Sequence, residues 1–215
     1  MNIGMLGTGM VGQAIGSRLV ELGHNVMMGS RSAANENARA WVRSRGQLAS
    51  HGTFAEAAAF GEILFNCTAG RGSLSALEFP RRSDLNGKIL VDLANPLDFS
   101  RGMPPTLTVC NVDSLGEQIQ RAHPLLRVVK ALNTVNVELM AHPELLHGPH
   151  DAFICGNDLE AKAEATRILN EWFGWKSVID LGDISNSRGL EMALPLWISL
   201  QKKLDTNIFN FKIVK

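Results

Sequence analysis

The sequence has 215 residues, of which 45% are hydrophobic and 20% are charged, and this composition is ordinary for a globular protein. Its 21 basic and 21 acidic residues cancel, which argues against partners such as nucleic acid or an anionic membrane. Three cysteines without a C-x-x-C pair argue against a disulfide scaffold, and no apolar run approaches the ~20 residues of a membrane helix. Because the chain enters a core strand directly, without room for a signal peptide, we expect a cytoplasmic protein.

The N-terminal stretch places a glycine motif between a strand and a helix. Residues 2–6 form a short apolar run that predicts a buried strand, and Gly7-Thr8-Gly9-Met10-Val11-Gly12 follows it directly. A helix-period pattern then runs to Gly23, and residues 25–28 predict a second strand. This is the context that the G-x-G-x-x-G dinucleotide fingerprint requires. It predicts a pyrophosphate at the helix N-terminus, with Gly7 for the sharp turn, Gly9 for close phosphate approach and Gly12 for helix packing.

The turn after the second strand selects the cofactor. NAD-binding chains usually place Asp or Glu here, where the carboxylate accepts hydrogen bonds from the ribose 2′-hydroxyl group. This sequence reads Gly29-Ser30-Arg31-Ser32 and has no carboxylate before Glu36. A guanidinium binds a 2′-phosphate through two charge-assisted hydrogen bonds, whereas a carboxylate repels it. Ser30 and Arg31 therefore predict NADP(H) rather than NAD(H).

A second loop is expected at the same crevice. Thr53 and Glu56 form a capping box for a helix that ends near Phe60. Residues 62–67 predict a buried strand that ends in Thr68-Ala69-Gly70-Arg71-Gly72. Because the carboxyl ends of strands line the crevice of a doubly wound sheet, we expect a ribose or nicotinamide against this loop. Arg71 is interpreted either as a further phosphate or substrate contact or as a solvated loop residue.

Strands and helices alternate through the following part of the chain. Helices are predicted at 33–45, 73–79, 114–122 and after the cap Asn157-Asp158, and strands at 88–93, 127–131, 151–155 and 176–180. The strand at 127–131 ends in Leu132-Asn133-Thr134-Val135, which places polar groups at another strand end. The alternation predicts an α/β fold of the Rossmann type, with a doubly wound, mostly parallel sheet.

The C-terminal tail has a different pattern. Residues 187–204 carry a helical apolar stripe in which Pro195 predicts a kink, and residues 207–214 alternate like a strand. We therefore expect a Rossmann domain over residues 1–182 and a small helix-plus-strand cap over residues 183–215 that completes the crevice. An exposed alternating strand edge invites pairing, so the cap also predicts a homodimer.

Several other chemistries lack their residues. The chain has no tyrosine, which excludes a Tyr-x-x-x-Lys dehydrogenase, and it has no P-loop. His142, His147 and His150 share one loop but lack the context of a metal site, so no metal ligand is assigned. No acid–base pair stands out either, and no catalytic side chain is assigned. Carbonyl reduction needs a proton donor, whereas reduction of a flavin-like ring needs mainly the stacking of two rings, so the second chemistry is favoured.

The sequence resembles the family of coenzyme F-420-dependent NADP oxidoreductases. The resemblance is carried by the glycine motif, Gly29-Ser30-Arg31, the stretch Val129–Val135 (VKALNTV) and the tail Leu190–Trp197 (LEMALPLW). It also extends to the nucleotide domain of the six-transmembrane metalloreductases, although no membrane segment is predicted here. The chain departs from the family at Asn35, where a further lysine for the 2′-phosphate is expected, and in the loop Asn66–Arg71, which is less apolar.

The resemblance implies a Rossmann fold with a C-terminal cap, an NADP(H) site and hydride transfer to coenzyme F-420 or a flavin. By position, the pyrophosphate would be held by Thr8, Gly9, Met10 and Val11, and the 2′-phosphate by Ser30 and Arg31. Thr68, Ala69, Asn133 and Thr134 would face the ribose and nicotinamide. Trp197 would either border the second ring or belong to the core.

Two other functions remain open at this point. One is an NADPH-dependent reductase of a small imine or carbonyl, with a proton relayed by Asn133, Thr134 or water. The other is a non-catalytic NADP-binding sensor or partner module. Steady oxidation of NADPH by a small-molecule acceptor would separate both enzymes from the sensor.

Overall fold

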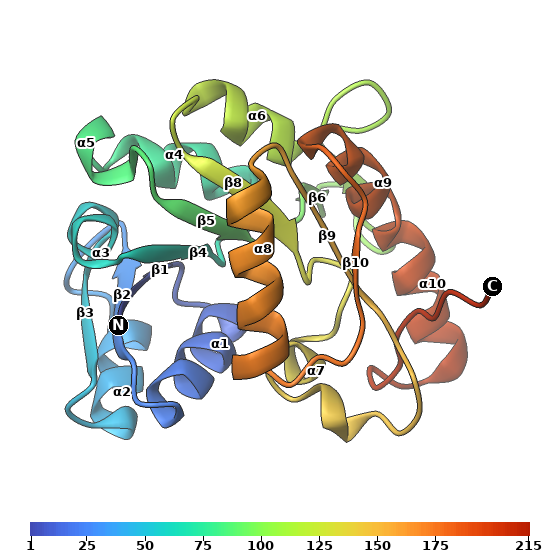
Figure 1. The fold of residues 1–215 in the computed structure, drawn as a ribbon, viewed down its shortest axis with the longest axis horizontal. Helices are drawn as coiled ribbons and strands as arrows, with labels where there is room; N and C mark the ends of the chain where they lie inside the picture. The colour runs from blue at the N-terminus through green and yellow to red at the C-terminus, as the bar shows by residue number, and fades with distance from the viewer.

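The computed structural model describes residues 1–215 as a central sheet covered by helices on both faces (Figure 1). The strands of this sheet are Asn2–Leu6 (β1), Asn25–Ser30 (β2), Ala49–Thr53 (β3), Ile63–Asn66 (β4), Ile89–Asp92 (β5), Arg127–Ala131 (β8), Ala152–Gly156 (β9) and Val178–Asp180 (β10). Their order is β10-β9-β8-β5-β4-β1-β2-β3. All neighbours are parallel except β8 and β9, which confirms the predicted Rossmann-type sheet. Two short strands, Leu97–Asp98 (β6) and Thr106–Leu107 (β7), form a separate ribbon.

Helices pack on the sheet through two apolar clusters. The helices are Met10–Glu21 (α1), Glu36–Arg45 (α2), Phe54–Phe60 (α3), Ser73–Glu78 (α4), Arg82–Leu85 (α5), Leu115–Ala122 (α6), Val137–Ala141 (α7), Leu159–Arg167 (α8), Ser187–Met192 (α9) and Leu194–Leu204 (α10). One cluster of 29 buried residues includes side chains of α1, α2 and α8, and the other, of 15, includes side chains of α3, α4 and α6. None of these helices has the length and apolarity that a bilayer crossing requires.

Side-chain caps fix the starts of two helices. At α3, the Thr53 hydroxyl accepts the Glu56 amide at 3.2 Å, and the Glu56 carboxylate accepts the Thr53 amide at 2.7 Å, which confirms the capping box. The Asn35 side chain caps α2 by accepting the Ala38 amide at 3.0 Å. The predicted helix at 33–45 therefore begins three residues later than its composition indicated.

Two features of the sheet were not visible in the sequence. The strand β3 is short and polar (ASHGT) and has no apolar alternation. Its backbone nevertheless pairs in parallel with residues 26–30 of β2. The strand β9 runs antiparallel to β8 because the connection between them holds only the five-residue α7 and a 3-10 turn, not a crossover helix. The chain therefore enters β9 from the edge at which β8 ends.

The C-terminal cap differs from its prediction in one respect. The helix is interrupted between α9 and α10 at Ala193, two residues before Pro195, which confirms the predicted kink. Residues 207–214, predicted as a strand, form no strand. Apart from one bond from the Asp151 amide to the Phe211 carbonyl, they are held mainly by hydrogen bonds of the Asp151 and Asn210 side chains. The strand edge on which the predicted homodimer rested is therefore absent.

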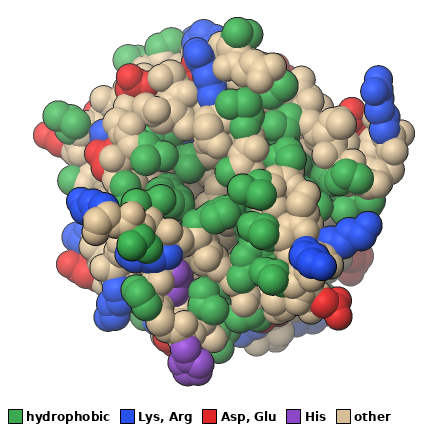
Figure 2. Space-filling model, turned by 90° about the vertical axis from the view of Figure 1, so that its right-hand side faces the viewer, with side chains coloured by type: hydrophobic (Ala, Val, Ile, Leu, Met, Phe, Trp, Pro, Cys, Tyr) green, Lys and Arg blue, Asp and Glu red, His purple; other side chains and the backbone are tan.

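The face of the molecule that carries the cap is rich in apolar side chains (Figure 2). The exposed apolar residues of the cap are Met192, Leu196, Leu204, Ile213 and Val214. The cap packs against the rest of the chain, because Ile184 belongs to the same apolar cluster as Leu115 and Ile119 of α6. The proposed boundary at residue 182 stays a prediction.

Replacing Phe65 with alanine should lower the free energy of unfolding by about 3–5 kcal/mol, the range for a buried aromatic residue. Phe65 has 0% of its surface exposed and lies edge-on to Phe173, with ring centroids 6.5 Å apart. Phe99→Ala is the matched control, because Phe99 is 54% exposed. Urea denaturation measures both, and equal losses for the two variants would contradict this description of the core.

Candidate functional site

A cavity of about 770 Å³ opens at the carboxyl ends of β1, β2 and β4, which are neighbours in the sheet. Parallel strands end at the same edge, so the loops that follow them meet there. Of the residues predicted from the sequence, the cavity is lined by Gly7, Thr8, Gly9, Ser30, Arg31, Thr68 and Ala69. Two loops far apart in sequence and the glycine turn therefore form one site.

The three motif glycines have different packing requirements. A Cβ at Gly7 would lie 2.5 Å from the Cys67 carbonyl oxygen, and this residue has φ +123°, a conformation that strongly favours glycine. A Cβ at Gly12 would lie 2.3 Å from the Gly7 carbonyl oxygen. A Cβ at Gly9 would meet no atom within 4 Å, although Gly9 lines the cavity. Gly7 and Gly12 are thus required by backbone packing, whereas Gly9 keeps open space in front of α1.

The cavity is positively charged. Arg31 and Arg71 are the two charged residues of its lining, which contains no carboxylate, and neither guanidinium makes a hydrogen bond or ion pair within the protein. The Ser30 hydroxyl donates to the Ser32 carbonyl at 2.6 Å, which orders the turn beside Arg31. Asn35 also lines the cavity, and its side-chain oxygen caps α2. The arrangement suits an anionic ligand with more than one charged group.

The loop after β4 is held from beneath by a buried polar chain. The Thr68 hydroxyl lies 2.7 Å from both the Asn66 side-chain oxygen and the Ser73 hydroxyl. The Asn66 amide in turn donates to the Asp92 carboxylate at 2.7 Å. Burial raises the pKa of the neighbouring Cys67 thiol far above its ordinary value, so this cysteine is not a thiolate nucleophile.

The other predicted site residues lie outside the lining of this cavity. Met10 and Val11 occupy the first turn of α1, where Met10 is exposed, and Gly12 is buried behind them. Asn133 and Thr134 are each 3% exposed and follow β8, which is separated from β4 by β5. Both still lie at the carboxyl edge of the sheet.

The histidine loop and Trp197 have partners within the protein. His142 contacts Glu144 at 3.1 Å, and the His150 ring lies against Trp175 with centroids 5.1 Å apart. Trp197 of α10 stacks on Phe209 at 5.0 Å, and its buried indole N–H has no acceptor. Trp197 therefore packs within the cap, and a contact of its ring with a second cofactor ring stays a prediction.

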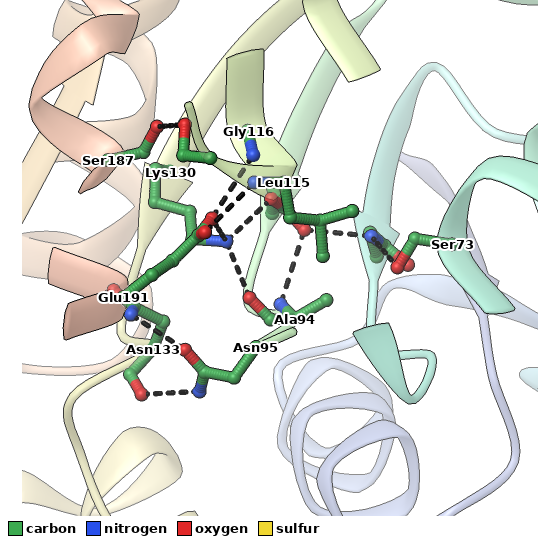
Figure 3. Close-up of polar contacts among 12 residues, drawn as sticks. Ser73, Ala94, Asn95, Leu115, Gly116, Lys130, Asn133, Ser187 and Glu191 are labelled. Carbon is green, nitrogen blue, oxygen red and sulfur yellow. Dashed lines mark hydrogen bonds and ion pairs between the residues drawn. The ribbon is translucent and has the colours of Figure 1, made fainter. Parts of the chain in front are cut away.

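A fully buried ion cluster lies at the junction of sheet and cap (Figure 3), and hydrogen bonds through Asn66 link it to the Thr68 loop of the cavity. The Lys130 ammonium of β8, with 0% of its side chain exposed, contacts the Asp92 carboxylate of β5 at 2.9 Å and the Glu191 carboxylate of α9 at 2.8 Å. It also donates to the Ala94 carbonyl. Burial alone would lower the pKa of Lys130, but the charges of Asp92 and Glu191 raise it above its ordinary value.

Every donor of this ammonium group has a partner. The three donors match Asp92, Ala94 and Glu191, so no proton of Lys130 is left for a substrate. Glu191 also accepts the Leu115 amide at 2.9 Å and the Gly116 amide at 3.1 Å, which are the first amides of α6. The cluster was not among the residues predicted from the sequence. The sequence feature that could have indicated the cluster is a lysine inside the apolar strand 127–131, because a buried charge requires partners.

Comparison with known proteins gives consistent matches. Residues 2–96 match the family described as NADP oxidoreductase, coenzyme F-420-dependent. A crystal structure from Arthrobacter sp. FB24, provisionally described as an F-420-dependent NADP reductase, is 46% identical with a TM-score of 0.94 over 100% of both chains. The F-420-dependent NADP reductase of Methanocaldococcus jannaschii is 34% identical over 125 residues, which are 57% of this chain and 54% of that protein.

A membrane reductase is also similar. Metalloreductase STEAP3 of Rattus norvegicus is 30% identical over 205 residues, which are 95% of this chain but 38% of that protein. The chain therefore spans about half of the Methanocaldococcus jannaschii reductase and less than two fifths of the rat protein, whereas it covers the whole of the Arthrobacter chain.

These findings confirm the resemblance seen in the sequence. They also confirm the predicted class of NADP-dependent oxidoreductase, with NADP(H) as its cofactor. The residue-by-residue assignment of the site and the identity of the hydride acceptor stay predictions. With one match over residues 2–96 and another over the full length at 46% identity, the chain belongs to the family of coenzyme F-420-dependent NADP oxidoreductases.

Proposed function

We propose that the chain binds NADP(H) in the 770 Å³ cavity and transfers hydride between its nicotinamide and a flavin-like or deazaflavin acceptor such as coenzyme F-420. The observation that carries the proposal is the pair of unpaired guanidiniums, Arg31 and Arg71, beside a glycine turn and without a carboxylate in the lining. A dinucleotide with a 2′-phosphate carries its charge in two places, the pyrophosphate and the ribose phosphate. The cavity offers donors for both.

The residues present fit this cofactor. The open space in front of Gly9 admits the pyrophosphate close to the first amides of α1, which have no partners within the helix. Arg31 would pair with the 2′-phosphate, with the ordered Ser30 turn beside it. Asn35 carries no charge and caps α2, so Arg71 would be the second cation of the site.

The proposed chemistry needs little from acidic or basic side chains. Bound NADPH supplies a hydride from its nicotinamide ring. The chain would hold the cofactor and fix its orientation at the sheet edge. The cavity lining contains no lysine, and the nearby Lys130 has all its donors committed, so it is not the proton source that carbonyl reduction needs. This favours transfer between two stacked rings, where positioning supplies most of the rate.

The acceptor is tested by NADPH oxidation at 340 nm with three acceptors: coenzyme F-420, FMN and a small cyclic imine. We expect oxidation with the deazaflavin or the flavin and none with the imine. Oxidation with the imine alone would replace this proposal by imine reduction. Binding of NADPH without turnover of any acceptor would favour a sensor or partner module.

Replacing Arg31 with alanine should weaken NADPH binding by about 1.5–3 kcal/mol, the range for a hydrogen bond to a charged group. NADH binding should hardly change, because NADH lacks the 2′-phosphate. Isothermal titration calorimetry at low salt measures both affinities. Arg43→Ala is the control, because Arg43 is exposed, has no ion pair and lies outside the cavity lining. Equal weakening of NADPH and NADH would show that Arg31 does not read the 2′-phosphate.

Alanine substitutions at Gly9 and Gly12 should have different effects, one on NADPH binding and the other on the stability of the fold. Gly9→Ala should keep the free energy of unfolding within about 0.5 kcal/mol and weaken NADPH binding at least tenfold, because the added methyl group projects into open space that the pyrophosphate needs. Gly12→Ala should lower the free energy of unfolding by about 1–3 kcal/mol through overpacking against Gly7. Thermal unfolding and NADPH titration of both variants check this, and unchanged NADPH binding in Gly9→Ala would place the pyrophosphate elsewhere.

A further inference from the structure

One buried acceptor atom at the sheet edge has no partner. The side-chain oxygen Oδ1 of Asn133 is buried without a hydrogen bond, and the residue is 3% exposed. Its amide nitrogen Nδ2 donates to the Asn95 side-chain oxygen at 2.9 Å and to the Leu190 carbonyl at 3.1 Å. Because both N–H donors of the amide are used, a 180° flip of the side-chain amide would break these hydrogen bonds and would not satisfy the oxygen. An unpaired buried acceptor is unfavourable unless a ligand or an ordered water molecule donates to it.

The backbone beside this atom is strained. Leu132, the residue between β8 and Asn133, has φ +58° and is 1% exposed. A left-handed conformation is unfavourable for a leucine and persists only when surrounding contacts impose it. Strained residues of this kind cluster at ligand sites. The turn and the unpaired oxygen are separate observations, and both point to the Asn133 side chain as a ligand contact.

Helix α9 holds this turn through two adjacent residues, Leu190 and Glu191, and Figure 3 shows the contact of Glu191. The Leu190 carbonyl fixes the Asn133 amide, and the Glu191 carboxylate contacts Lys130, three residues before Asn133, at 2.8 Å. Lys130 is fixed on its other side by Asp92 at 2.9 Å. The strained Leu132 turn thus lies between two contacts with the same helix.

The charges of the cluster favour one placement of α9. One ammonium and two carboxylates leave an excess negative charge, and Glu191 directs its carboxylate to the first amides of α6, where the helix dipole is positive. Moving α9 by even one residue would leave a buried charge unpaired, which is strongly unfavourable. An apolar contact would tolerate such a shift. The cluster therefore specifies position more than it adds stability.

We propose that Glu191 is a positioning residue for the cofactor: it fixes α9 on Lys130 so that the Leu190 carbonyl orients the Asn133 amide, whose free oxygen accepts an N–H of the nicotinamide carboxamide. This inference rests on the proposed function, because it places the nicotinamide end of the cofactor beyond Thr68, toward β8. It assigns Glu191 no contact with the reacting atoms. It also explains why the cap lies against the β8 turn instead of only covering the sheet.

The test compares whole NADPH with 2′,5′-ADP, which has the adenosine half and the 2′-phosphate but no nicotinamide. Glu191→Gln should raise the dissociation constant of NADPH at least fivefold and leave that of 2′,5′-ADP within twofold. Asn133→Ala should show the same difference between the two ligands. The double variant should bind NADPH no more weakly than whichever single variant binds it less tightly, because both substitutions remove the same interaction.

Arg188→Ala is the matched control. Arg188 also lies on α9 and pairs with Glu117 of α6, its Nε 2.8 Å from the carboxylate, but it contacts neither Lys130 nor the β8 turn. It should change neither affinity. Thermal unfolding shows whether each variant is folded at the titration temperature, and Glu191→Asp, which keeps the charge but shortens the side chain, replaces Glu191→Gln if that variant does not fold.

The possible outcomes are distinct. Equal weakening of both ligands in Glu191→Gln would mean that the cluster has only a structural role, and unchanged NADPH binding in Asn133→Ala would mean that its oxygen does not contact the cofactor; either result overturns the inference. Additive effects in the double variant would overturn the link between the two residues. If the unaltered protein binds neither NADPH nor 2′,5′-ADP, the proposed function itself fails.

Discussion

Burial of the Lys130 ammonium group is the constraint on which the junction of sheet and cap depends. A lysine with no exposed surface must have its three donors satisfied, and here they require β5, the loop after it and α9 to meet at one point. Asp92 of this cluster accepts a hydrogen bond from Asn66, which lies beneath the Thr68 loop. Glu191 accepts a hydrogen bond from the N-terminus of α6. A single charge thus connects the cofactor cavity to the C-terminal helices. Replacing such a cluster by apolar side chains often leaves stability unchanged, so its value lies in fixing the arrangement.

The cavity follows from a second constraint, the close approach of backbone segments around the glycine motif. Gly7 and Gly12 are in contact with backbone atoms that leave no room for a Cβ, and this contact brings α1 against the end of β1. The helix N-terminus then faces the same space as Arg31 and Arg71. Unpaired amides and unpaired guanidiniums on one side of a cavity, without a carboxylate, favour an anionic ligand. Family membership identifies that ligand as NADP(H), and the geometry explains how the chain would hold it.

The charged residues beneath the sheet edge have partners within the protein. Lys130, Asp92 and Glu191 satisfy one another, and burial raises the pKa of the Cys67 thiol well above its ordinary value. What remains near the sheet edge are amides, hydroxyls and backbone groups. Such groups orient two aromatic ring systems well but are poor proton donors, which agrees with a hydride transfer that proximity and orientation promote.

The sequence by itself determined the elements whose signals are local. The strand–glycine–helix unit at residues 2–28, the capping box of Thr53 and Glu56, and the break near Pro195 each depend on residues within a few positions of one another. The Ser30-Arg31 turn likewise indicates the cofactor through two adjacent residues, because the charge next to the ribose depends on that turn alone. These patterns sufficed for the fold class, and they named the glycine turn and the Ser30-Arg31 turn that line the cavity.

Only the tertiary structure decided the features that depend on distant partners. The polar strand β3 exists because β2 lies beside it, and β9 is antiparallel because of how the chain leaves β8. Residues 207–214 alternate like a strand, but their partner is mainly the Asp151 side chain rather than a strand edge. The cluster of Asp92, Lys130 and Glu191 joins residues that are 38 and 61 positions apart, so no local pattern predicts it. Local sequence fixes which conformation a segment prefers, whereas burial of charge and pairing of backbone are decided by neighbours that only folding supplies.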